Sequence, residues 1–398
     1  MKKILIISHA MEIGGAERAL LGLLDSIDLD KYKVDLFLSR HEGELYYDIP
    51  QGIHILPTNQ SKYLAIPMTS LLKDRQYKML YGRLKAKLLS HHRVKQLNLG
   101  LDNTVNLLYS HKYTYKYMDD INIDTKYDLA ISFLTPHYIC LNKCNAKKKI
   151  AWIHTDYSTI DIDVENELEM WKQYDHIVSI SDKVTESFLK KMPSLKDKII
   201  RIDNIMTSDS IIKQSNETIT DMNRVEDETI LCSIGRFSHA KNFDNVPAIC
   251  KKIVEAGINV KWYLIGYGGD EKLIRDKIKE YNMENHVIIL GKKVNPYPYI
   301  KACDIYVQPS RYEGKAVTVR EAQILSKSVI ITDFPTAHSQ LVDNYDGIIV
   351  PKDNVGCANG IMSVIKDKEL QNRLMSNTKN TNYSNSSEVE KIYKLMED

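Results

Sequence analysis

Two glutamates with seven residues between them, Glu313 and Glu321, carry groups that can bind the hydroxyls of a ligand. An apolar run typical of a buried strand precedes them, Gly314 follows the first glutamate, and apolar residues then recur at helical spacing. This pattern predicts a strand, a glycine-containing loop and a helix that begins near Lys315 to Thr318. Backbone N–H groups at a helix start have no partner within the helix and favour an anion. The stretch therefore predicts a phosphate-binding loop flanked by two carboxylates, which suits a sugar attached to a nucleoside diphosphate.

Two bases follow an earlier apolar run, residues 230–234. Gly235 precedes Arg236, and Lys241 comes five residues after that arginine. The guanidinium is a planar fork that fits phosphate oxygens, and the ammonium is a point charge. We expect both bases to stabilise the negative charge that develops on a departing phosphate.

The first residues of the sequence show a third pattern. The apolar run at residues 4–7 predicts a buried strand, and Gly14, Gly15, Glu17 and Arg18 follow it where a loop turns into a helix. Two glycines after a first strand let the backbone approach a ligand closely. The fingerprint G-x-G-x-x-G is absent, which disfavours a redox dinucleotide.

Short apolar runs alternate with helical patterns along the chain, which predicts parallel sheets flanked by helices. A length of 398 residues fits two domains. We expect an α/β domain at residues 1–205, a polar linker at 206–228 and a second α/β domain at 229–384. The expected strands are residues 4–7, 34–38, 53–56, 129–133, 150–153, 176–180, 199–202, 230–234, 260–265, 287–290, 305–307, 329–331 and 348–350. His154 directly follows one of them, at the strand end where α/β proteins bind ligands.

Composition disfavours several classes of protein. A net charge of +2 gives no sign of a nucleic-acid binder. Six scattered cysteines indicate structural thiols in a reducing cytoplasm rather than a zinc site. The N-terminal apolar run is too short for a signal peptide, and no segment approaches the roughly 20 apolar residues of a spanning helix. Any membrane contact is therefore expected to be peripheral.

The segment from Lys62 to Lys95 stands apart in charge. It holds nine lysines and arginines against one acid, Asp74, with leucines and tyrosines interleaved. The bases do not fall on one clean helical face, so amphipathicity is weak. Such a cationic segment suggests an anionic surface or a pyrophosphate as its partner, and a solvated helix is the alternative that needs no ligand.

Taken in order, Gly14-Gly15, His154, Arg236 with Lys241, and Glu313 with Glu321 resemble the motifs of retaining GT-B glycosyltransferases of family four, the type found in bacterial capsular and cell-surface polysaccharide synthesis. The resemblance implies two Rossmann-like parallel-sheet domains that face a central cleft. It also implies that the last helix, within residues 385–398, packs back on the first domain.

The resemblance implies roles for individual residues. Donor binding is assigned to Gly15, Arg236, Lys241, Lys293, Glu313, Gly314, Ala316, Val317 and Glu321. Acceptor binding is assigned to Gly14, Gly15, Glu17, Arg18 and His154, and catalysis to His154, Arg236, Lys241 and Glu313. Lys293 lies in a loop whose backbone, in relatives, reads the base of the nucleotide.

The implied reaction moves a hexose or N-acetylhexosamine from a nucleoside-diphosphate sugar, UDP-linked, with retention of the anomeric configuration. No cofactor and no metal are expected, because protein bases supply the positive charge. Asp161 and Asp163 form a D-x-D like the metal motif of the GT-A fold, but in the wrong architecture, and we interpret it as coincidence. Lys315-Ala316 departs from the pattern of many relatives, which leaves the identity of the sugar open.

The expected acceptor is a glycan, polyprenyl-diphosphate-linked, at the inner face of the cytoplasmic membrane, with the Lys62–Lys95 segment on anionic lipid. Two alternatives stay open: a catalytically silent sugar-nucleotide-binding scaffold, and a GT-B enzyme of another kind, such as a sugar-nucleotide epimerase. A phosphorylase of the same shape needs a lysine for pyridoxal phosphate, and nothing in the sequence marks one.

Overall fold

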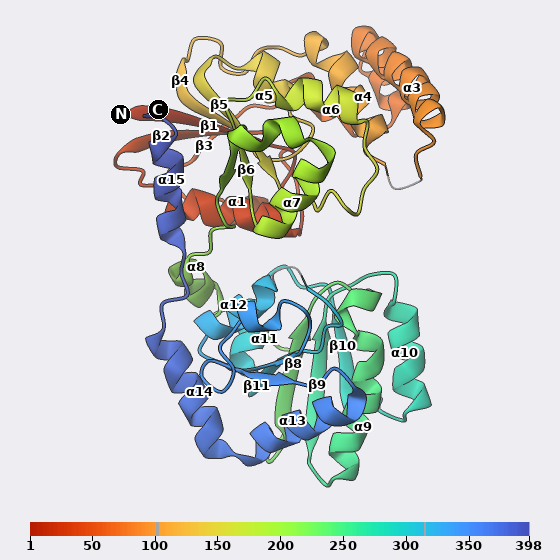
Figure 1. Cartoon of the computed structure of the whole chain (residues 1–398), viewed down its shortest axis with the longest axis vertical. Helices are drawn as coiled ribbons and strands as arrows, with labels where there is room; N and C mark the ends of the chain where they lie inside the picture. Colours follow the sequence, from red (N-terminus) through yellow and green to blue (C-terminus); the bar gives the residue numbers. More distant parts are fainter. Residues whose placement is uncertain (101–102, 314–315, 398) are drawn as a thin grey trace. The chain divides into compact units, whose positions relative to one another are not determined.

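The computed structural model describes residues 1–100, 103–313 and 316–397, which form two α/β units (Figure 1). Unit 1 comprises Met1–Met206 and the C-terminal segment from Asn385, and unit 2 comprises Thr207–Ser384. Gly314, which was predicted to bind the donor, and Lys315 lie outside the described residues.

Unit 1 contains a sheet of seven parallel strands in the order β3-β2-β1-β4-β5-β6-β7. The strands are β1 (Lys2–Ser8), β2 (Tyr32–Leu38), β3 (His54–Leu56), β4 (Tyr127–Ser132), β5 (Ala146–Ile153), β6 (His176–Ser179) and β7 (Ile199–Arg201). The α-helices are α1 (Gly15–Ser26), α2 (Met68–Lys73), α3 (Tyr77–Leu97), α4 (Val105–Thr114), α5 (Tyr138–Lys143), α6 (Val164–Trp171), α7 (Asp182–Lys191) and α15 (Val389–Lys394).

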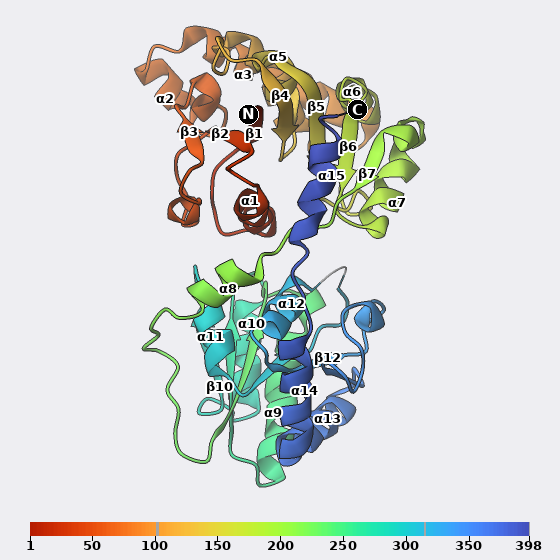
Figure 2. The same ribbon diagram turned by 90° about the vertical axis from the view of Figure 1, so that its left-hand side faces the viewer.

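Both faces of this sheet are buried, which explains why its strands read as continuous apolar runs rather than as alternating ones. Along β1, Ile4 and Ile6 belong to the core under α1 and α15, whereas Leu5 and Ile7 belong to the core that includes α3 and α4. Figure 2 shows α1 and α15 beside the sheet.

The C-terminal segment is held to unit 1 by specific contacts. The Asn385 side chain accepts a hydrogen bond from the backbone N–H of Met206 at 2.8 Å, and the Tyr393 hydroxyl accepts one from the N–H of Asp28 at 2.9 Å. The Tyr393 ring also stacks on Tyr32 with 4.1 Å between centroids.

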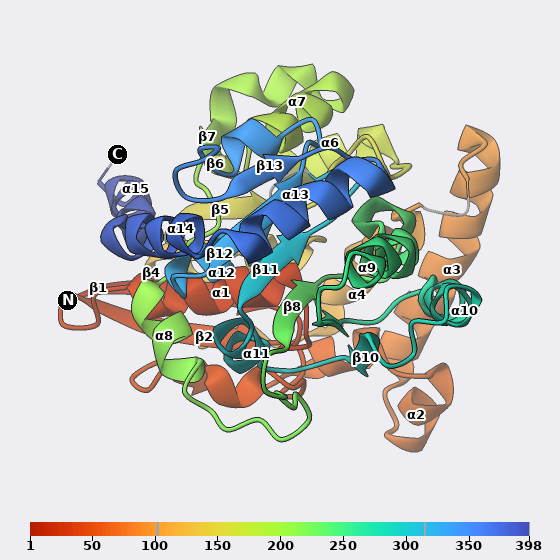
Figure 3. The same ribbon diagram turned by 90° about the horizontal axis from the view of Figure 1, so that it is seen from below.

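Unit 2 contains a sheet of six parallel strands in the order β10-β9-β8-β11-β12-β13; β8, β11 and β12 lie side by side in Figure 3. The strands are β8 (Thr229–Ile234), β9 (Val260–Ile265), β10 (Val287–Gly291), β11 (Ile305–Gln308), β12 (Ser328–Thr332) and β13 (Ile348–Val350). The α-helices are α8 (Ser208–Gln214), α9 (Val246–Glu255), α10 (Glu271–Glu280), α11 (Tyr297–Ala302), α12 (Val317–Ile324), α13 (Asn354–Lys366) and α14 (Lys368–Asn380).

The polar stretch expected as a linker, residues 206–228, differs from that expectation. It contains α8, which packs against α11 and α12. Arg224 pairs with Asp304 at 2.9 Å, and the Tyr263 hydroxyl donates to the carbonyl of Asn223 at 3.0 Å. The stretch therefore lies along unit 2, and its lack of hydrophobic periodicity reflects polar contacts rather than freedom.

The predicted α/β class with parallel sheets is confirmed. Every strand of the described residues overlaps an expected one, because each is a short apolar run buried on both sides.

Gly22 marks a close backbone approach inside unit 1. It lies in α1, and a Cβ at this position would stand 1.9 Å from the carbonyl oxygen of Ile205. A backbone carbonyl cannot move aside as a flexible side chain would, so the packing of α1 on the segment before Met206 requires glycine.

We expect Gly22→Ala to destabilise unit 1 by about 1–3 kcal/mol, the usual cost of overpacking a core. Gly15→Ala is the matched control, since a Cβ at Gly15, in the same helix, meets nothing within 4 Å. Thermal unfolding of both variants measures the difference. Equal melting temperatures would contradict the close approach.

Candidate functional site

The unit 2 candidates gather where the strand order of the sheet reverses. β8 and β11 are neighbours although they are distant in sequence, and loops at the carboxyl ends of such strands leave a crevice for ligands. Arg236 and Lys241 follow β8, and Glu313 follows β11. The topology thus places the loop that carries the two bases beside the loop that carries the carboxylate, although the carboxylate follows them by more than 70 residues along the chain.

Lys241 and Glu313 form the central contact of this group. The Lys241 ammonium lies 2.6 Å from Glu313 Oε1, and the Glu313 side chain is only 9% exposed. The same oxygen accepts hydrogen bonds from the Ser310 hydroxyl at 2.6 Å and from the Gln308 amide at 3.3 Å. These donors fix the carboxylate in one position, while the side chain of Arg236 is exposed.

A glycine turn after β9 supports the loop that carries Arg236. Gly266 and Gly268 have φ angles of +148° and +155°, which side chains rarely adopt. Cβ atoms there would lie 1.9 Å from the carbonyl oxygen of Gly235 and 2.3 Å from that of Phe237. The turn therefore packs directly under the backbone on either side of Arg236.

The start of α12 is less open to an anion than the sequence predicted. The backbone N–H of Ala316 donates to the side-chain oxygen of Gln340 at 2.9 Å, so in this structure an amide satisfies the group that was assigned to phosphate. Glu321 is buried on the same helix and accepts a hydrogen bond from the Tyr297 hydroxyl at 3.2 Å. Gln340 and Tyr297 are contacts that the sequence did not reveal.

Lys293 is held by the polar stretch of unit 2. Its ammonium lies 2.5 Å from Asp221 Oδ2, and the Tyr299 hydroxyl donates to Asp221 Oδ1 at 2.8 Å. The hydrogen bond to Asp221 raises the pKa of Lys293. The side chain thus braces residues 214–228 against the loop after β10, and only its backbone is left for reading a base.

The unit 1 glycines stand at the start of α1. Gly14 caps the helix in an extended conformation, and the Glu17 carboxylate folds back over it, with Oε2 2.2 Å from where a Cβ of Gly14 would be. Burial raises the pKa of Glu17. The backbone N–H of Arg18 donates to the carbonyl of Gly14 at 3.1 Å. These contacts keep the turn tight, and a side chain at Gly14 would have to displace the flexible Glu17 carboxylate.

His154 lies directly after β5, as predicted. Its ring centroid is 4.5 Å from that of Phe133, and its Nε2 atom is enclosed without a hydrogen-bond partner among the described residues. Burial lowers the pKa of His154 to about 4. The imidazole is therefore neutral at pH 7, and a neutral ring can accept a proton or a hydrogen bond.

Two further buried histidines, His111 and His137, lie in unit 1, and sequence analysis did not single them out. The ring of His111 on α4 lies 5.6 Å from that of His9, and His137 Nδ1 lies 2.7 Å from the Ser132 hydroxyl at the end of β4. Burial holds the pKa values of His111 and His137 well below their usual range. Only the tertiary structure gathers these rings, which come from separate segments.

The D-x-D of residues 161–163 serves the structure of unit 1. Asp161 accepts a hydrogen bond from the backbone N–H of Gly100 at 2.9 Å. Asp163 caps α6 and accepts two hydrogen bonds from the Arg93 guanidinium, at 2.8 and 3.0 Å. Both carboxylates are thus engaged with protein groups.

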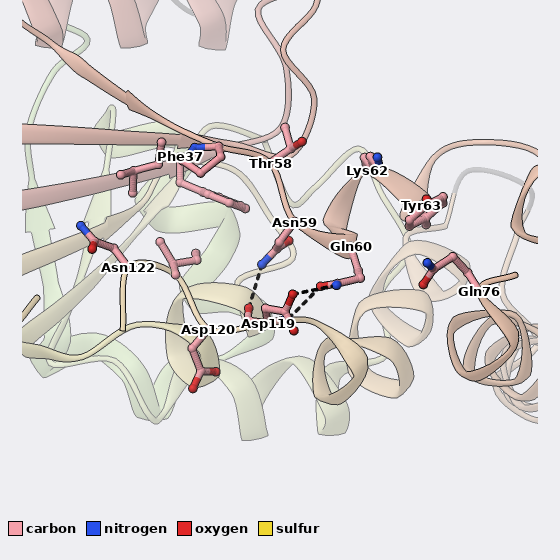
Figure 4. Close-up of a pocket in the computed structure, with 13 residues that line it drawn as sticks. Phe37, Thr58, Asn59, Gln60, Lys62, Tyr63, Gln76, Asp119, Asp120 and Asn122 are labelled. Carbon is pink, nitrogen blue, oxygen red and sulfur yellow. Dashed lines mark hydrogen bonds between the residues drawn. The ribbon is translucent and has the colours of Figure 1, made fainter. Parts of the chain in front are cut away.

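A pocket of about 490 Å³ opens elsewhere in unit 1, near the ends of β2 and β3 (Figure 4). Its lining residues are Phe37, Leu56, Pro57, Thr58, Asn59, Gln60, Lys62, Tyr63, Gln76, Asp119, Asp120, Ile121 and Asn122. The Gln60 amide and the Asp119 carboxylate pair at 2.8 Å, and the Asn59 amide donates to the carbonyl of Asp119 at 2.8 Å. None of the predicted catalytic residues lines this pocket, so we assign it no role in the chemistry.

Comparison with known families places the unit 2 site in context. Residues 214–381 match the family Glycosyl transferases group 1. A Campylobacter jejuni protein, N-acetylgalactosamine-N,N'-diacetylbacillosaminyl-diphospho-undecaprenol 4-alpha-N-acetylgalactosaminyltransferase, is 24% identical over 93% of this chain and 92% of its own length. An uncharacterized glycosyltransferase of Methanocaldococcus jannaschii is 30% identical over 40% of this chain, a match that spans only 39% of that protein.

Solved structures share the fold across the whole chain. Staphylococcus aureus TarM in a complex that includes UDP has a TM-score of 0.66 at 15% identity, with 100% of both chains covered. Anabaena HepE in complex with UDP and glucose has a TM-score of 0.62 at 16% identity, again over 100% of both chains. The GT-B fold implied by the sequence motifs is confirmed.

The buried histidines predict how the stability of unit 1 depends on pH. Their pKa values are lowered in the folded unit, so below pH 6.5 the unfolded chain binds protons that the folded unit does not. The free energy of unfolding should then fall as pH falls from about 6.5 towards 4, by up to about 1.4 kcal/mol per histidine per pH unit.

Urea unfolding between pH 7.5 and 5 measures this slope. In a Trp262→Phe background the remaining tryptophans, Trp152 and Trp171, report on unit 1 alone. His111→Gln should flatten the slope, whereas His91→Gln, at an exposed position, should leave it unchanged. If the free energy of unfolding of the parent protein did not change with pH, the inference that His111, His137 and His154 are buried and neutral would be contradicted.

Proposed function

We propose that this chain, which carries a group 1 glycosyltransferase domain at residues 214–381 and has the GT-B fold, transfers a sugar from a UDP-sugar to a lipid-linked glycan with retention of the anomeric configuration. The observation that carries the proposal is the Lys241–Glu313 pair at the point where the unit 2 strand order reverses, with the exposed Arg236 in the same loop after β8. A nucleoside diphosphate placed there has its leaving phosphate beside two bases, and its sugar beside a fixed carboxylate.

In this mechanism the bond between the anomeric carbon and the β-phosphate oxygen breaks, and negative charge builds on that phosphate. Arg236 and Lys241 stabilise the charge where it develops. The acceptor hydroxyl approaches the same face of the sugar, bonds to the anomeric carbon and gives its proton to the departing phosphate oxygen. Glu313 orients a sugar hydroxyl through Oε2, since the Lys241, Ser310 and Gln308 contacts all reach Oε1.

The relatives support the choice of substrates. The names of the Campylobacter jejuni relative and of a Staphylococcus aureus relative describe N-acetylhexosaminyl transfer, the first to an undecaprenyl-diphosphate-linked acceptor and the second to poly(ribitol-phosphate). Another relative is the Staphylococcus aureus capsular polysaccharide biosynthesis glycosyltransferase CapM. We accordingly assign a hexosyl or N-acetylhexosaminyl transfer in surface-polysaccharide synthesis, carried out peripherally at the cytoplasmic face of the membrane.

Arg236→Ala and Lys241→Ala should each slow transfer about 30- to 1000-fold, the effect of removing about 2–4 kcal/mol of stabilisation from the transition state. The measurement is release of UDP and formation of glycoside from a panel of UDP-sugars. Lys252→Ala, an exposed lysine on α9, is the matched control.

Because Lys241 also neutralises the nearly buried Glu313, thermal unfolding is recorded for each variant, and Lys241→Ala is repeated with Glu313→Gln. Unchanged rates in the folded Arg236 and Lys241 variants would contradict the assignment of the donor site to these two residues. Binding of UDP-sugar by the parent protein without turnover on any acceptor would favour the silent scaffold.

Transfer should also continue in excess EDTA, since protein bases are assigned the stabilisation of the phosphate and the Asp161 and Asp163 carboxylates already bind Gly100 and Arg93. The check is the rate before and after chelation, with manganese added back. Loss of activity in EDTA and recovery with manganese would show a metal in the transition state.

A further inference from the structure

Helix α3 (Tyr77–Leu97) has two apolar faces. Its inner face, with Met79, Gly82 and Ala86, is buried and packs on α4. The contact is close, since a Cβ on Gly82 would lie 2.8 Å from the carbonyl oxygen of Tyr113. This inner face accounts for the position of α3 in unit 1 and leaves the opposite face to be explained.

The outer face carries large apolar side chains in an unbroken stripe. Tyr77, Tyr81, Leu84 and Leu88 follow one another at spacings of four, three and four residues, so at 3.6 residues per turn they lie along one line. Their exposed fractions are 62%, 61%, 46% and 73%. Leu72 on the neighbouring α2 is also exposed, at 53%. A contiguous exposed apolar surface of this kind usually marks an interaction site.

Lysines border the stripe on both sides. At 3.6 residues per turn, Lys78 and Lys85 fall on one side of it and Lys87 on the other. Residues 75–97 contain no acid, and no carboxylate of the described residues forms an ion pair with these three lysines. Lys85 Nζ lies over the ring of Tyr113 on α4, 5.2 Å from its centroid. The border therefore presents positive charge that no acid neutralises next to apolar surface.

Two arginines of the same segment have a different task. The Arg83 guanidinium donates to the carbonyls of Tyr63 and Ile66, at 2.9 and 2.5 Å, and Arg93 pairs with Asp163. Their charge serves the fold of unit 1. The bases of the cationic segment do not fall on one face of the helix because these arginines, bound inside unit 1, alternate in sequence with exposed lysines.

We infer that the outer face of α3 docks onto an anionic lipid bilayer, with the helix lying in the plane of the membrane surface. Tyrosines and leucines between lysines are the composition of interfacial helices, whose apolar side chains enter the boundary of the acyl chains while the lysines meet anionic headgroups. In Figures 1 and 3 α3 lies at the periphery of unit 1. None of the described helices is long and apolar enough to cross a membrane. The inference extends the proposed function by naming the surface that would meet a lipid-linked acceptor, and its test needs no activity.

Tryptophan fluorescence gives a direct test. The native tryptophans Trp152, Trp171 and Trp262 are at most 2% exposed, so a new exposed tryptophan dominates any change of environment. With Tyr81→Trp, emission should shift to the blue on addition of phosphatidylglycerol–phosphatidylcholine vesicles, and not with phosphatidylcholine alone. Tyr47→Trp is the matched control, at a 90% exposed tyrosine of the same unit, and should not shift.

Co-sedimentation with the same vesicles separates charge from apolar contact. Replacing Lys78, Lys85 and Lys87 with Gln should weaken binding about fivefold per lysine, roughly a hundredfold together. Replacing Tyr81, Leu84 and Leu88 with Gln should weaken it at least about tenfold. The matched controls are Lys252, Lys279 and Lys366 to Gln, and Leu273, Val342 and Val355 to Gln, all at exposed positions of unit 2.

Equal partitioning of the α3 variants and the controls, or no shift for Tyr81→Trp, would overturn the proposal. So would a parent protein that ignores vesicles but forms a dimer that the Tyr81, Leu84 and Leu88 replacements dissociate, because the stripe would then be a contact between copies. Vesicle binding without transferase activity would support the docking surface while the proposed function failed.

Discussion

Parallel strands buried on both faces leave few places where a ligand can meet the backbone, and each sheet of this chain is subject to that constraint. Along β1, Ile4 and Ile6 pack to one side while Leu5 and Ile7 pack to the other, so helices cover the whole strand. Polar groups that act on a ligand must then follow the strands at their carboxyl ends, where Arg236, Lys241 and Glu313 are found in unit 2 and His154 in unit 1.

Electrostatics in the two units are arranged in opposite ways. Unit 2 holds the Glu313 carboxylate beside the Lys241 ammonium and beside hydroxyl and amide donors. Unit 1 surrounds its histidines with apolar side chains and so keeps the imidazoles neutral. A buried, neutral surrounding is compatible with the proposed binding of an uncharged acceptor hydroxyl by unit 1.

The arginines and the lysines of α3 make different kinds of contact. Arg83 and Arg93 donate to carbonyls and a carboxylate inside unit 1, whereas Lys78, Lys85 and Lys87 are exposed on α3. The planar guanidinium donates to several acceptors at once and suits the interior, whereas the flexible lysine side chain suits an exposed position. Charge counted along the sequence cannot make this distinction, since it depends on what each side chain reaches.

The sequence by itself determined the strands, the α/β class and the residues placed at strand ends, because buried parallel strands are continuous apolar runs and their loops follow at once. It placed Arg236, Lys241, Glu313 and His154 in this way, and it correctly indicated the GT-B fold. Two buried polar residues, Gln308 at the end of β11 and Ser310 just after it, carried a signal that could have been used, since polar groups at the end of an apolar strand need partners.

Only the tertiary structure decided which groups meet. Segments distant in the chain are joined by the Lys241–Glu313 pair, the Gln340 side chain on the Ala316 N–H, the Asp221–Lys293 contact and the His9–His111 ring contact. Periodicity reports which side of an element is buried, but not what lies opposite. For that reason α3, which is apolar on two faces, shows only weak hydrophobic periodicity in the sequence. Its two faces can be told apart only because the structure shows which of them packs on α4.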